Sequence, residues 1–217
     1  MIRSTSRIAA AVALTAALSA CGTDQQESPS GFSVMRQAAT QIVAARKADQ
    51  TPVAAPDPSA MTAEALRVNP GPLIMVGMES AGTTQVLAMT GENNGMRTYM
   101  TKNEQSVILR NGMLVGTRGL GNDLSVAESS GSAALILAGR SGQAQRVMRH
   151  YSGDGLERAI PLDCRVGPGP KPGVMVEDCT GLGLSIQNSY ITSGGRVTVS
   201  RQWVGPALGY MTIQTLR

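Results

Sequence analysis

The sequence predicts an all-β domain over residues 61–217, an antiparallel barrel or sandwich-like structure of about ten strands. Three observations support this prediction. Short apolar runs follow one another from Leu73 to the C-terminus, with turn residues between them at the spacing of antiparallel sheets. Two of the joints are explicit hairpin signals, Asn111-Gly112 and Gly194-Gly195. Two cysteines, Cys164 and Cys179, fall on successive strand-like runs.

Residues 1–20 have the features of a lipoprotein signal peptide. Arg3 and Arg7 precede an uncharged apolar run, Ile8–Leu18, which is shorter than the ~20 residues that span a bilayer. The run ends in Leu-Ser-Ala-Cys, so we predict cleavage before Cys21 and lipidation of that cysteine. An ordinary signal peptide with a chance cysteine is the alternative. Gly22 after the cysteine favours the outer membrane, with the protein facing the periplasm.

Residues 21–60 are predicted to be a lipidated tether, a helix and a linker. Apolar residues recur at helical spacing from residue 33 to 50, and the Pro/Ala-rich stretch from residue 51 to 60 reads as the linker. The apolar face of this helix is mostly alanine, which favours packing on the protein over lying on lipid. A second, short helix is predicted from Thr62 to Val68, before Asn-Pro-Gly-Pro.

The predicted strands then follow in order, and one short helix interrupts them from Ser129 to Ala138 because that stretch is rich in alanine and leucine. The strand-like runs are LIMVGM, TQVLAM, MRTYM, SVILR, MLVGTR, AQRVMRHY, ERAIPLDC, GVMVEDC, LSIQNSYIT, RVTVSRQWV and YMTIQTL.

A disulfide between Cys164 and Cys179 is predicted, because an even pair of cysteines remains in a chain sent outside the cytoplasm. On the chain-entropy model this closure stabilises the fold by roughly 3 kcal/mol. A metal site is the rival interpretation, but the two cysteines and the single histidine, His150, have no recognisable ligand spacing. We predict no metal and no cofactor beyond the covalent lipid on Cys21.

The charge of the chain argues against nucleic-acid binding. Removal of residues 1–20 takes away two arginines and no acid, which leaves 17 basic and 15 acidic residues. No basic cluster interleaved with aromatics is present.

No motif for catalysis is complete. The glycines around Gly116–Gly121 match neither a dinucleotide loop nor a phosphate loop. His150 is the only histidine that could activate a nucleophile, and it reads as a half-exposed strand residue. A pair of carboxylates for glycan hydrolysis is not excluded by sequence spacing. Glu177 and Asp178 are adjacent and therefore point to opposite faces of a strand.

Arg201 is the most unusual charged residue. It alternates with Val197, Val199 and Trp203, so the pattern places a charge on an apolar face. We expect Arg201 to be paired and partly buried, and a ligand-binding arginine next to Trp203 is the alternative.

Two stretches carry a family resemblance. RNGMLVGTRGLGNDL resembles the segment of the YjbF/GfcB lipoproteins of exopolysaccharide and group 4 capsule production in which a strand ends in a Thr-x-Gly-Leu turn followed by Asp-Leu. SRQWVGPALGYMTI resembles their C-terminal Gln-Trp and Gly-Tyr signature. An Asn-x-Tyr, Asn188 and Tyr190, stands in order between them, and the resemblance covers Leu73 to the C-terminus. The matching residues are Thr117, Gly119, Leu120, Asp123, Leu124, Gln202, Trp203, Gly209 and Tyr210.

The resemblance implies an all-β lipoprotein that assists exopolysaccharide or capsule production or export, and it supplies no catalytic residue. We therefore predict a non-catalytic protein that binds glycan or a protein of the export machinery. The alternatives are a glycan-modifying enzyme of the periplasm that uses Asp123 with another acid, and a structural envelope lipoprotein without a ligand. The candidate contacts are Asp123, Arg201, Gln202 and Trp203.

Overall fold

The computed structural model describes residues 57–151 and 154–217. The predicted signal peptide, Cys21, the helix over residues 33–50 and residues 51–56 of the predicted linker lie outside these residues. In the part of the chain that is described, no helix has the length and apolar character needed to cross a membrane.

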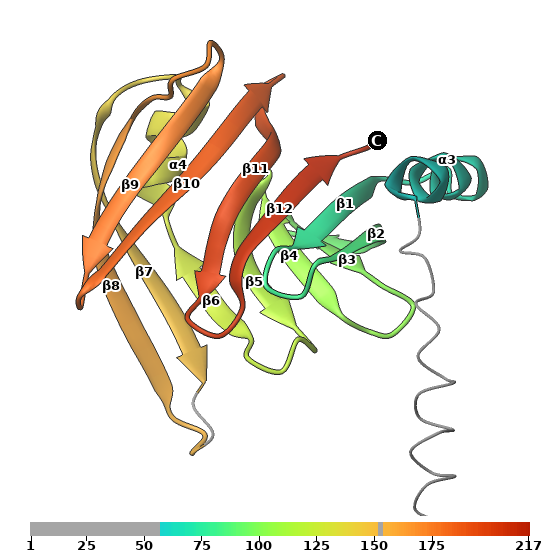
Figure 1. Cartoon of the computed structure of the whole chain (residues 1–217), viewed down its shortest axis with the longest axis horizontal. Coiled ribbons are helices and arrows are strands. Elements are labelled where there is room, and N and C mark those ends of the chain that lie inside the picture. The colour runs from blue at the N-terminus through green and yellow to red at the C-terminus, as the bar shows by residue number, and fades with distance from the viewer. Residues whose placement is uncertain (1–56, 152–153) are drawn as a thin grey trace, which may run out of the picture. The chain divides into compact units, whose positions relative to one another are not determined.

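The described residues form twelve strands and two helices (Figure 1). In chain order these are α3 (Pro58–Val68), β1 (Leu73–Met78), β2 (Thr83–Asn93), β3 (Met96–Met100), β4 (Ser106–Arg110), β5 (Met113–Arg118), β6 (Leu124–Glu128), α4 (Ser130–Leu137), β7 (Gly142–Tyr151), β8 (Glu157–Pro168), β9 (Val174–Gly181), β10 (Leu184–Ser193), β11 (Arg196–Gly205) and β12 (Gly209–Thr215). The all-β prediction is confirmed, and so is the helix between Ser129 and Ala138.

One strand, β6, is absent from the sequence-based prediction. Its five residues, Leu124–Glu128, include Ser125, Ala127 and Glu128, and a helix follows almost at once. Serine, alanine and glutamate have little intrinsic preference for strands. The strand forms because β6 pairs with the long strand β7.

The strands make one antiparallel sheet in the order β5-β4-β3-β2-β1-β12-β11-β10-β9-β8-β7-β6. The first strand β1 pairs with the last strand β12, and the sheet curls until its two end strands, β5 and β6, lie beside each other. The result is a nearly closed barrel. Between β5 and β6 the described residues show no backbone ladder, and we call this line the seam.

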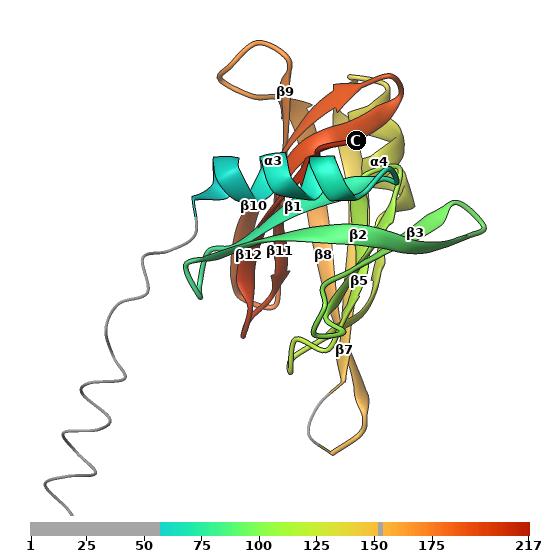
Figure 2. The same ribbon diagram turned by 90° about the vertical axis from the view of Figure 1, so that its right-hand side faces the viewer.

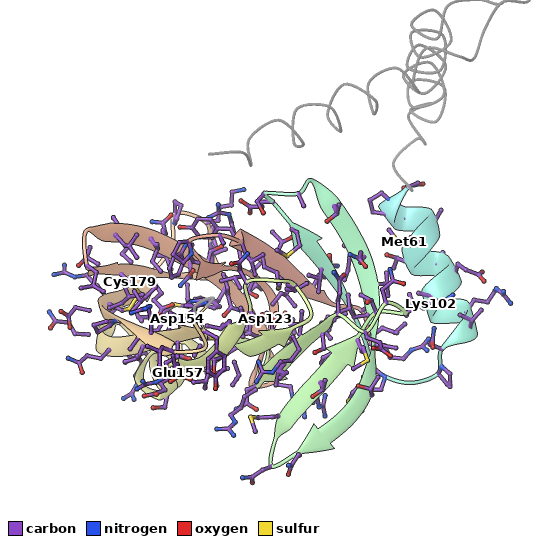
Figure 3. The ribbon with its side chains drawn as sticks, turned by 90° about the horizontal axis from the view of Figure 1, so that it is seen from below. Met61, Lys102, Asp123, Asp154, Glu157 and Cys179 are labelled. Atoms are coloured by element: carbon purple, nitrogen blue, oxygen red, sulfur yellow. A yellow bond between two sulfur atoms is a disulfide. The ribbon has the colours of Figure 1, made fainter. Side chains whose placement is uncertain are left out.

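The barrel has two ends. The hairpin turns β2–β3, β4–β5, β8–β9 and β10–β11 lie at the end that carries α4, which we call the α4 end. The loops β1–β2, β3–β4, β5–β6, β7–β8 and β9–β10 lie at the other end, which we call the Asp123 end after a residue of its β5–β6 loop (Figure 3).

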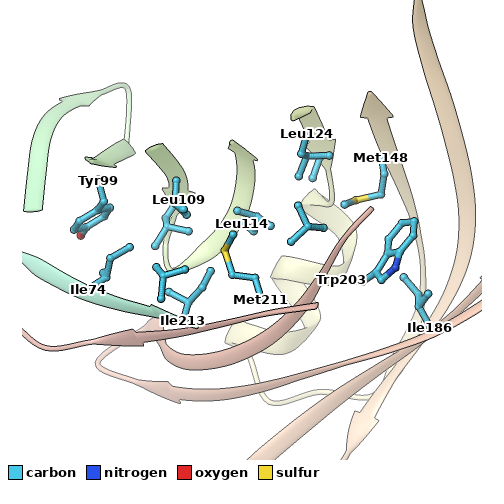
Figure 4. Close-up of a cluster of buried hydrophobic side chains, with 14 of the residues drawn as sticks. Ile74, Tyr99, Leu109, Leu114, Leu124, Met148, Ile186, Trp203, Met211 and Ile213 are labelled. Carbon is cyan, nitrogen blue, oxygen red and sulfur yellow. The ribbon is translucent and has the colours of Figure 1, made fainter. Parts of the chain in front are cut away.

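Apolar side chains fill the interior. A large cluster includes Ile74, Leu114, Met148, Trp203 and Met211, which converge from both sides of the barrel (Figure 4). A second cluster joins Ile136 of α4 to strand residues near the α4 end. The helix α4 thus contributes to the core, and it contacts β7, β8 and β10.

The helix α3 lies across β1 and β2 (Figure 2). It begins at Pro58, ahead of the predicted start at Thr62, so it crosses the predicted domain boundary between residues 60 and 61. Asp57 caps it by accepting the N–H of Ser59 at 2.9 Å, and proline is favoured in the first turn. At its other end the guanidinium of Arg217 donates to the carbonyls of Leu66 and Asn69.

The Asn111-Gly112 turn is the predicted β4–β5 hairpin, and it also reaches across the α4 end to β11. The Asn111 carbonyl accepts the N–H of Val197 at 2.9 Å. Gly112 has φ +81°, and a Cβ at this position would lie 2.0 Å from the carbonyl oxygen of Val197. Glycine is therefore required here both by backbone conformation and by close approach.

We expect Gly112→Ala to lower the free energy of unfolding by more than the ~1–2 kcal/mol that a left-handed alanine costs. The reason is that the added methyl meets backbone rather than a movable side chain. Gly195→Ala is the matched control, because Gly195 has φ +74° in the β10–β11 turn with nothing within 4 Å of its Cβ position. Urea unfolding of both variants gives the difference. Equal losses would show that the contact with β11 contributes nothing.

Candidate functional site

Asp123 lies in the β5–β6 loop (Figure 3) and holds this loop through both of its carboxylate oxygens. Its Oδ1 accepts the Thr117 hydroxyl at 2.9 Å and the Leu120 N–H at 3.1 Å, and its Oδ2 accepts the Gly119 N–H at 2.8 Å. The Thr117 hydroxyl in turn accepts the N–H of Leu124 at 3.0 Å. The Thr-x-Gly-Leu and Asp-Leu motif is therefore a hydrogen-bonded turn. Contact between Asp123 and glycan stays a prediction.

Arg201 is partly exposed on β11. It forms an ion pair with an acid, as expected from the sequence. Its Nε and Nη2 donate to the two carboxylate oxygens of Glu79 at 2.6 and 2.7 Å, and its guanidinium stacks over Tyr210 at 3.5 Å. Val197 and Trp203 are buried instead of sharing its face. The alternation fails because the pairing of β11 carries register shifts on both sides.

Gln202 and Trp203 point into the barrel. The side-chain oxygen of Gln202 accepts the N–H of Leu114 at 3.1 Å, and its amide donates to Ser200 at 2.9 Å. Trp203 is 5% exposed and packs in the main core (Figure 4). The Gln-Trp motif thus connects β11 to β5 across the interior.

The four predicted contact residues do not converge on one surface. Asp123 lies in a loop at one end, Arg201 is on β11 with an acid partner, and Gln202 and Trp203 are in the core. A shared binding surface made from these side chains is not present in the structure.

A buried polar cluster, which sequence reasoning missed, lies inside the barrel. We call Arg146, Glu177, Asn188 and Tyr190 the Arg146 cluster; all four residues are at most 1% exposed. Oε2 of Glu177 accepts hydrogen bonds from Arg146 Nη1 at 2.9 Å, Asn188 Nδ2 at 2.8 Å and the Tyr190 hydroxyl at 2.7 Å. Asn188 Oδ1 also accepts the backbone N–H of Trp203 at 2.7 Å. The Asn-x-Tyr motif is therefore part of this cluster.

The cluster keeps its charges although it is buried. Burial by itself raises the pKa of Glu177, but the positive charge of Arg146 and the hydrogen bonds from Asn188 and Tyr190 outweigh it and lower the pKa below 4.5. Burial likewise lowers the pKa of Arg146, and its two partners raise it above the ordinary value. The Tyr190 pKa is raised, chiefly by burial. The cluster is thus a buried ion pair with a neutral tyrosine.

A periodic signal in the sequence could have located this cluster. Glu177 alternates with Met175 and Cys179 on one side of β9, and Arg146 alternates with Met148 on one side of β7. Both charges therefore stand on the faces that their apolar neighbours place in the core.

The Cys164–Cys179 disulfide is present and joins residues that stand directly opposite each other on β8 and β9. The prediction of this bridge is confirmed. A carboxylate oxygen of Glu177 lies within 4.8 Å of both sulfur atoms, which makes this trio the one metal-like grouping among the described residues. Sulfur atoms bonded to each other are not thiolate ligands, so the oxidised trio does not fit a metal ion.

A polar pocket opens at the α4 end, between the β2–β3 hairpin, the Asn111-Gly112 turn and the β10–β11 hairpin. We call it the mouth pocket; its volume is about 140 Å³, and its lining includes Glu92, Arg97, Tyr99, Asn111, Arg196 and Thr198. Arg97 donates to Glu92 at 2.8 Å, which raises the Arg97 pKa. Among the described residues no acid pairs with Arg196. Barrel mouths are common ligand sites.

A second, shallower hollow lies on the outer face of β7, β8 and β9. It has a volume of about 560 Å³, and its lining includes the polar side chains of Gln143, Gln145, Asp163, Arg165 and Asp178. Several of these groups bond to one another or to neighbours; Gln187, for example, donates to Asp178 at 2.7 Å. The mouth pocket is the more enclosed of the two.

Comparisons with known proteins agree with this architecture. Over 68% of this chain and 87% of the other, the fold is similar to the crystal structure of the hypothetical lipoprotein YmcC from Escherichia coli K12, with a TM-score of 0.58 and 19% sequence identity. No curated protein matches the sequence.

The sequence model of one family, described as group 4 capsule polysaccharide lipoprotein GfcB, YjbF, matches residues 36–216. The match starts well before Leu73, so the resemblance is wider than its two motifs indicate. Because the match covers most of the sequence and both motifs occupy defined places in the barrel, this chain belongs to the YjbF family of group 4 capsule polysaccharide lipoproteins.

Proposed function

We propose that this protein is a lipid-anchored, periplasm-facing lipoprotein of the outer membrane that assists capsule or exopolysaccharide export, and that it binds glycan at the mouth pocket without catalysing a reaction. The family and the structural neighbour are both described as lipoproteins, and the family description names capsule polysaccharide. The predicted lipid on Cys21 supplies the anchor.

The composition of the mouth pocket is the observation that supports glycan binding. Arginine offers several N–H donors, and Glu92 and Asn111 offer acceptors, so the pocket can match hydroxyl groups that both donate and accept. Two arginines against one glutamate leave the pocket with a net positive charge, which favours an acidic sugar. A volume of about 140 Å³ is below the ~300–1,000 Å³ of pockets that enclose drug-sized ligands, so the pocket takes at most one sugar unit or the end of a chain.

The engagement of Asp123 supports a non-catalytic role. The two oxygens of an ionised carboxylate offer about four acceptor sites, and hydrogen bonds within its own loop use three of those of Asp123, so holding the turn accounts for most of its hydrogen-bonding capacity. Incubation of the purified protein with the cognate polymer tests this directly. A change in chain length or linkage would establish the enzymatic alternative.

We expect Arg97→Ala combined with Arg196→Ala to weaken binding of oligosaccharides from the organism's own capsule at least tenfold. A hydrogen bond to a charged group contributes about 1.5–3 kcal/mol, and 1.4 kcal/mol corresponds to a factor of ten in affinity. Isothermal titration calorimetry measures the change. Arg165→Ala is the control, because Arg165 is exposed in the hollow on β7–β9.

Each result of this titration separates the candidate surfaces. If Arg165→Ala loses affinity while Arg97→Ala combined with Arg196→Ala keeps full affinity, the glycan site lies on the outer face of β7, β8 and β9 instead. If the wild-type protein binds no oligosaccharide, glycan binding is wrong, and a structural or partner-binding role takes its place.

A further inference from the structure

The loops at the two ends of the barrel carry opposite charge. The hairpin turns at the α4 end and the β6–β7 connection that contains α4 include two bases, Arg140 and Lys171, and no acid. The described loop residues at the Asp123 end have the opposite balance, four acids against one base: Glu79, Glu104, Asp123, Asp154 and Lys102. The α4 end is therefore the positive end of the domain.

Two further cations stand where strands reach the turns of the α4 end. Arg110 is the last residue of β4, and Arg196 is the first residue of β11. We call Arg110, Arg140, Lys171 and Arg196 the cationic rim; all four side chains are exposed. In the described part of the chain none of the four forms a salt bridge. The rim thus presents four cations to solvent.

Two acids near strand ends on the same side of the barrel are already paired. Glu92, near the end of β2, accepts Arg97 at 2.8 Å. Glu128, the last residue of β6, accepts Arg149 at 2.6 Å. Because each of these carboxylates has its own arginine, neither neutralises the cationic rim, and the charge of the rim is available to a ligand.

The members of the rim follow one another around the α4 end. Those on β4 and β11 are close because each precedes one of two bonded residues, the Asn111 carbonyl and the Val197 N–H at 2.9 Å. Ser141 follows Arg140 directly, and its hydroxyl oxygen would lie 3.7 Å from a Cβ on Gly167, where β8 runs into the hairpin that contains Lys171. The β8–β9 and β10–β11 hairpins are neighbours because β9 pairs with β10. The rim is therefore one continuous surface.

The turns that carry the rim have no large apolar side chain. They consist mainly of glycine, proline, asparagine and serine, and none of the large exposed apolar residues in the described chain lies in them. Segments that dock on lipid present apolar side chains beside their basic ones. The centres of protein interfaces are rich in aromatic residues and depleted of charge. A soluble polymer with repeated negative charge needs only exposed cations.

We infer that the cationic rim binds the chain of an acidic polysaccharide whose end occupies the mouth pocket. This inference rests on the proposed function. Arg196 lines the mouth pocket and belongs to the rim, so a chain that leaves the pocket enters the rim directly. Carboxylates on successive sugars then meet arginine and lysine side chains, which form charge-assisted hydrogen bonds with them. The ligand class is therefore a polymer with repeated negative charge, rather than a neutral glycan or a single acidic sugar.

A variant that removes the three rim charges outside the mouth pocket tests the inference. For Arg110→Gln, Arg140→Gln and Lys171→Gln combined, we expect the affinity for polygalacturonate, which has a carboxylate on every sugar, to fall about tenfold. Digalacturonate reaches little beyond the pocket, and its affinity should fall less than about twofold, because charges more than ~8 Å away are largely screened at physiological salt. Neutral dextran should not distinguish the variant from the wild-type protein. Isothermal titration calorimetry on the full lipidated protein in detergent measures all three ligands.

The matched control removes the same number of exposed positive charges outside the rim: Arg67→Gln, Lys102→Gln and Arg158→Gln combined. We expect it to keep full affinity for polygalacturonate. Equal weakening in both triple variants would reduce the effect to overall charge and overturn the inference, as would full affinity in the rim variant. If the rim variant loses the polymer while Arg97→Ala combined with Arg196→Ala keeps full affinity for digalacturonate, the rim stands and the proposed mouth site is wrong.

Acylation of lysine amines distinguishes a polymer from a membrane as the occupant of the rim. With the lipidated protein in nanodiscs of phosphatidylcholine, we expect polygalacturonate to slow acylation of Lys171 but not of Lys102, which is exposed outside the rim. Protection of Lys171 by phosphatidylglycerol without polymer would assign the rim to lipid head groups and overturn the inference. An unprotected Lys171 in the presence of bound polymer would overturn it as well.

Discussion

Glu177→Gln is expected to lower the free energy of unfolding by about 3–5 kcal/mol, the largest effect of any single substitution that we predict. The change leaves the fully buried guanidinium of Arg146 without its counter-charge. It also replaces a carboxylate, one oxygen of which accepts three hydrogen bonds, with an amide that has one acceptor oxygen and one donor NH2 group. Urea unfolding followed by circular dichroism measures the loss.

Asp178→Asn is the matched control, because Asp178 is the next residue on β9 and points outward. An exposed substitution of this kind is expected to change stability by no more than about 0.5 kcal/mol. The double variant Arg146→Met with Glu177→Leu is expected to recover much of the loss, because it removes both charges together. A double variant as unstable as the sum of its single variants would show that the two charges do not act as a pair.

The same ion pair predicts a dependence on pH. The folded pKa of Glu177 is lowered below 4.5, so the unfolded chain takes up a proton before the folded chain does. The stability that Glu177 contributes is therefore complete above its unfolded pKa and is lost as the pH falls through its folded pKa. Between about pH 5 and pH 3 we expect a smaller fall in stability for the double variant than for the wild-type protein.

Removal of the disulfide is expected to have the next largest effect. Cys164→Ala with Cys179→Ala should cost about 3 kcal/mol, because the bridge closes a loop with a sequence separation of 15 and restricts the unfolded chain. The folded state should keep its strands, since the two residues stand within the continuous pairing of β8 with β9.

Chemical reduction of the wild-type protein provides a second measurement of the free energy of unfolding that the disulfide contributes. Unfolding of the reduced wild-type protein and of the double alanine variant should then occur at similar urea concentrations. A loss below about 1 kcal/mol in both cases would contradict a stabilising role for the bridge and the chain-entropy account of it.

The elements that the sequence predicts correctly depend on local chemistry. Asn111-Gly112 and Gly194-Gly195 form hairpins because their backbone conformations are open to few other residues. The short helix α4 follows from a run of alanine and leucine. Arg201 is paired as expected, but the apolar face from which the sequence predicts this pairing is not formed, and Glu79 itself was not identified.

The candidate site depends on contacts that local patterns do not contain. Arg146 and Glu177 are 31 residues apart and lie on strands separated by β8. The mouth pocket needs three hairpins to meet at one end of the barrel. Trp203 alternates with Arg201 in the sequence, yet the register shifts of β11 bury the tryptophan and leave the arginine partly exposed.

The class of this domain, its main hairpins, its disulfide and its family can be predicted from the sequence, because strand periodicity, turn residues and motifs are properties of neighbouring residues. Three further features are seen in the folded chain alone: twelve strands curl into a nearly closed barrel, Glu177 is the buried partner of Arg146, and β5 and β6 meet without a ladder. These features arise from the register and curvature of the whole sheet, so they depend on the packing of residues far apart in the chain.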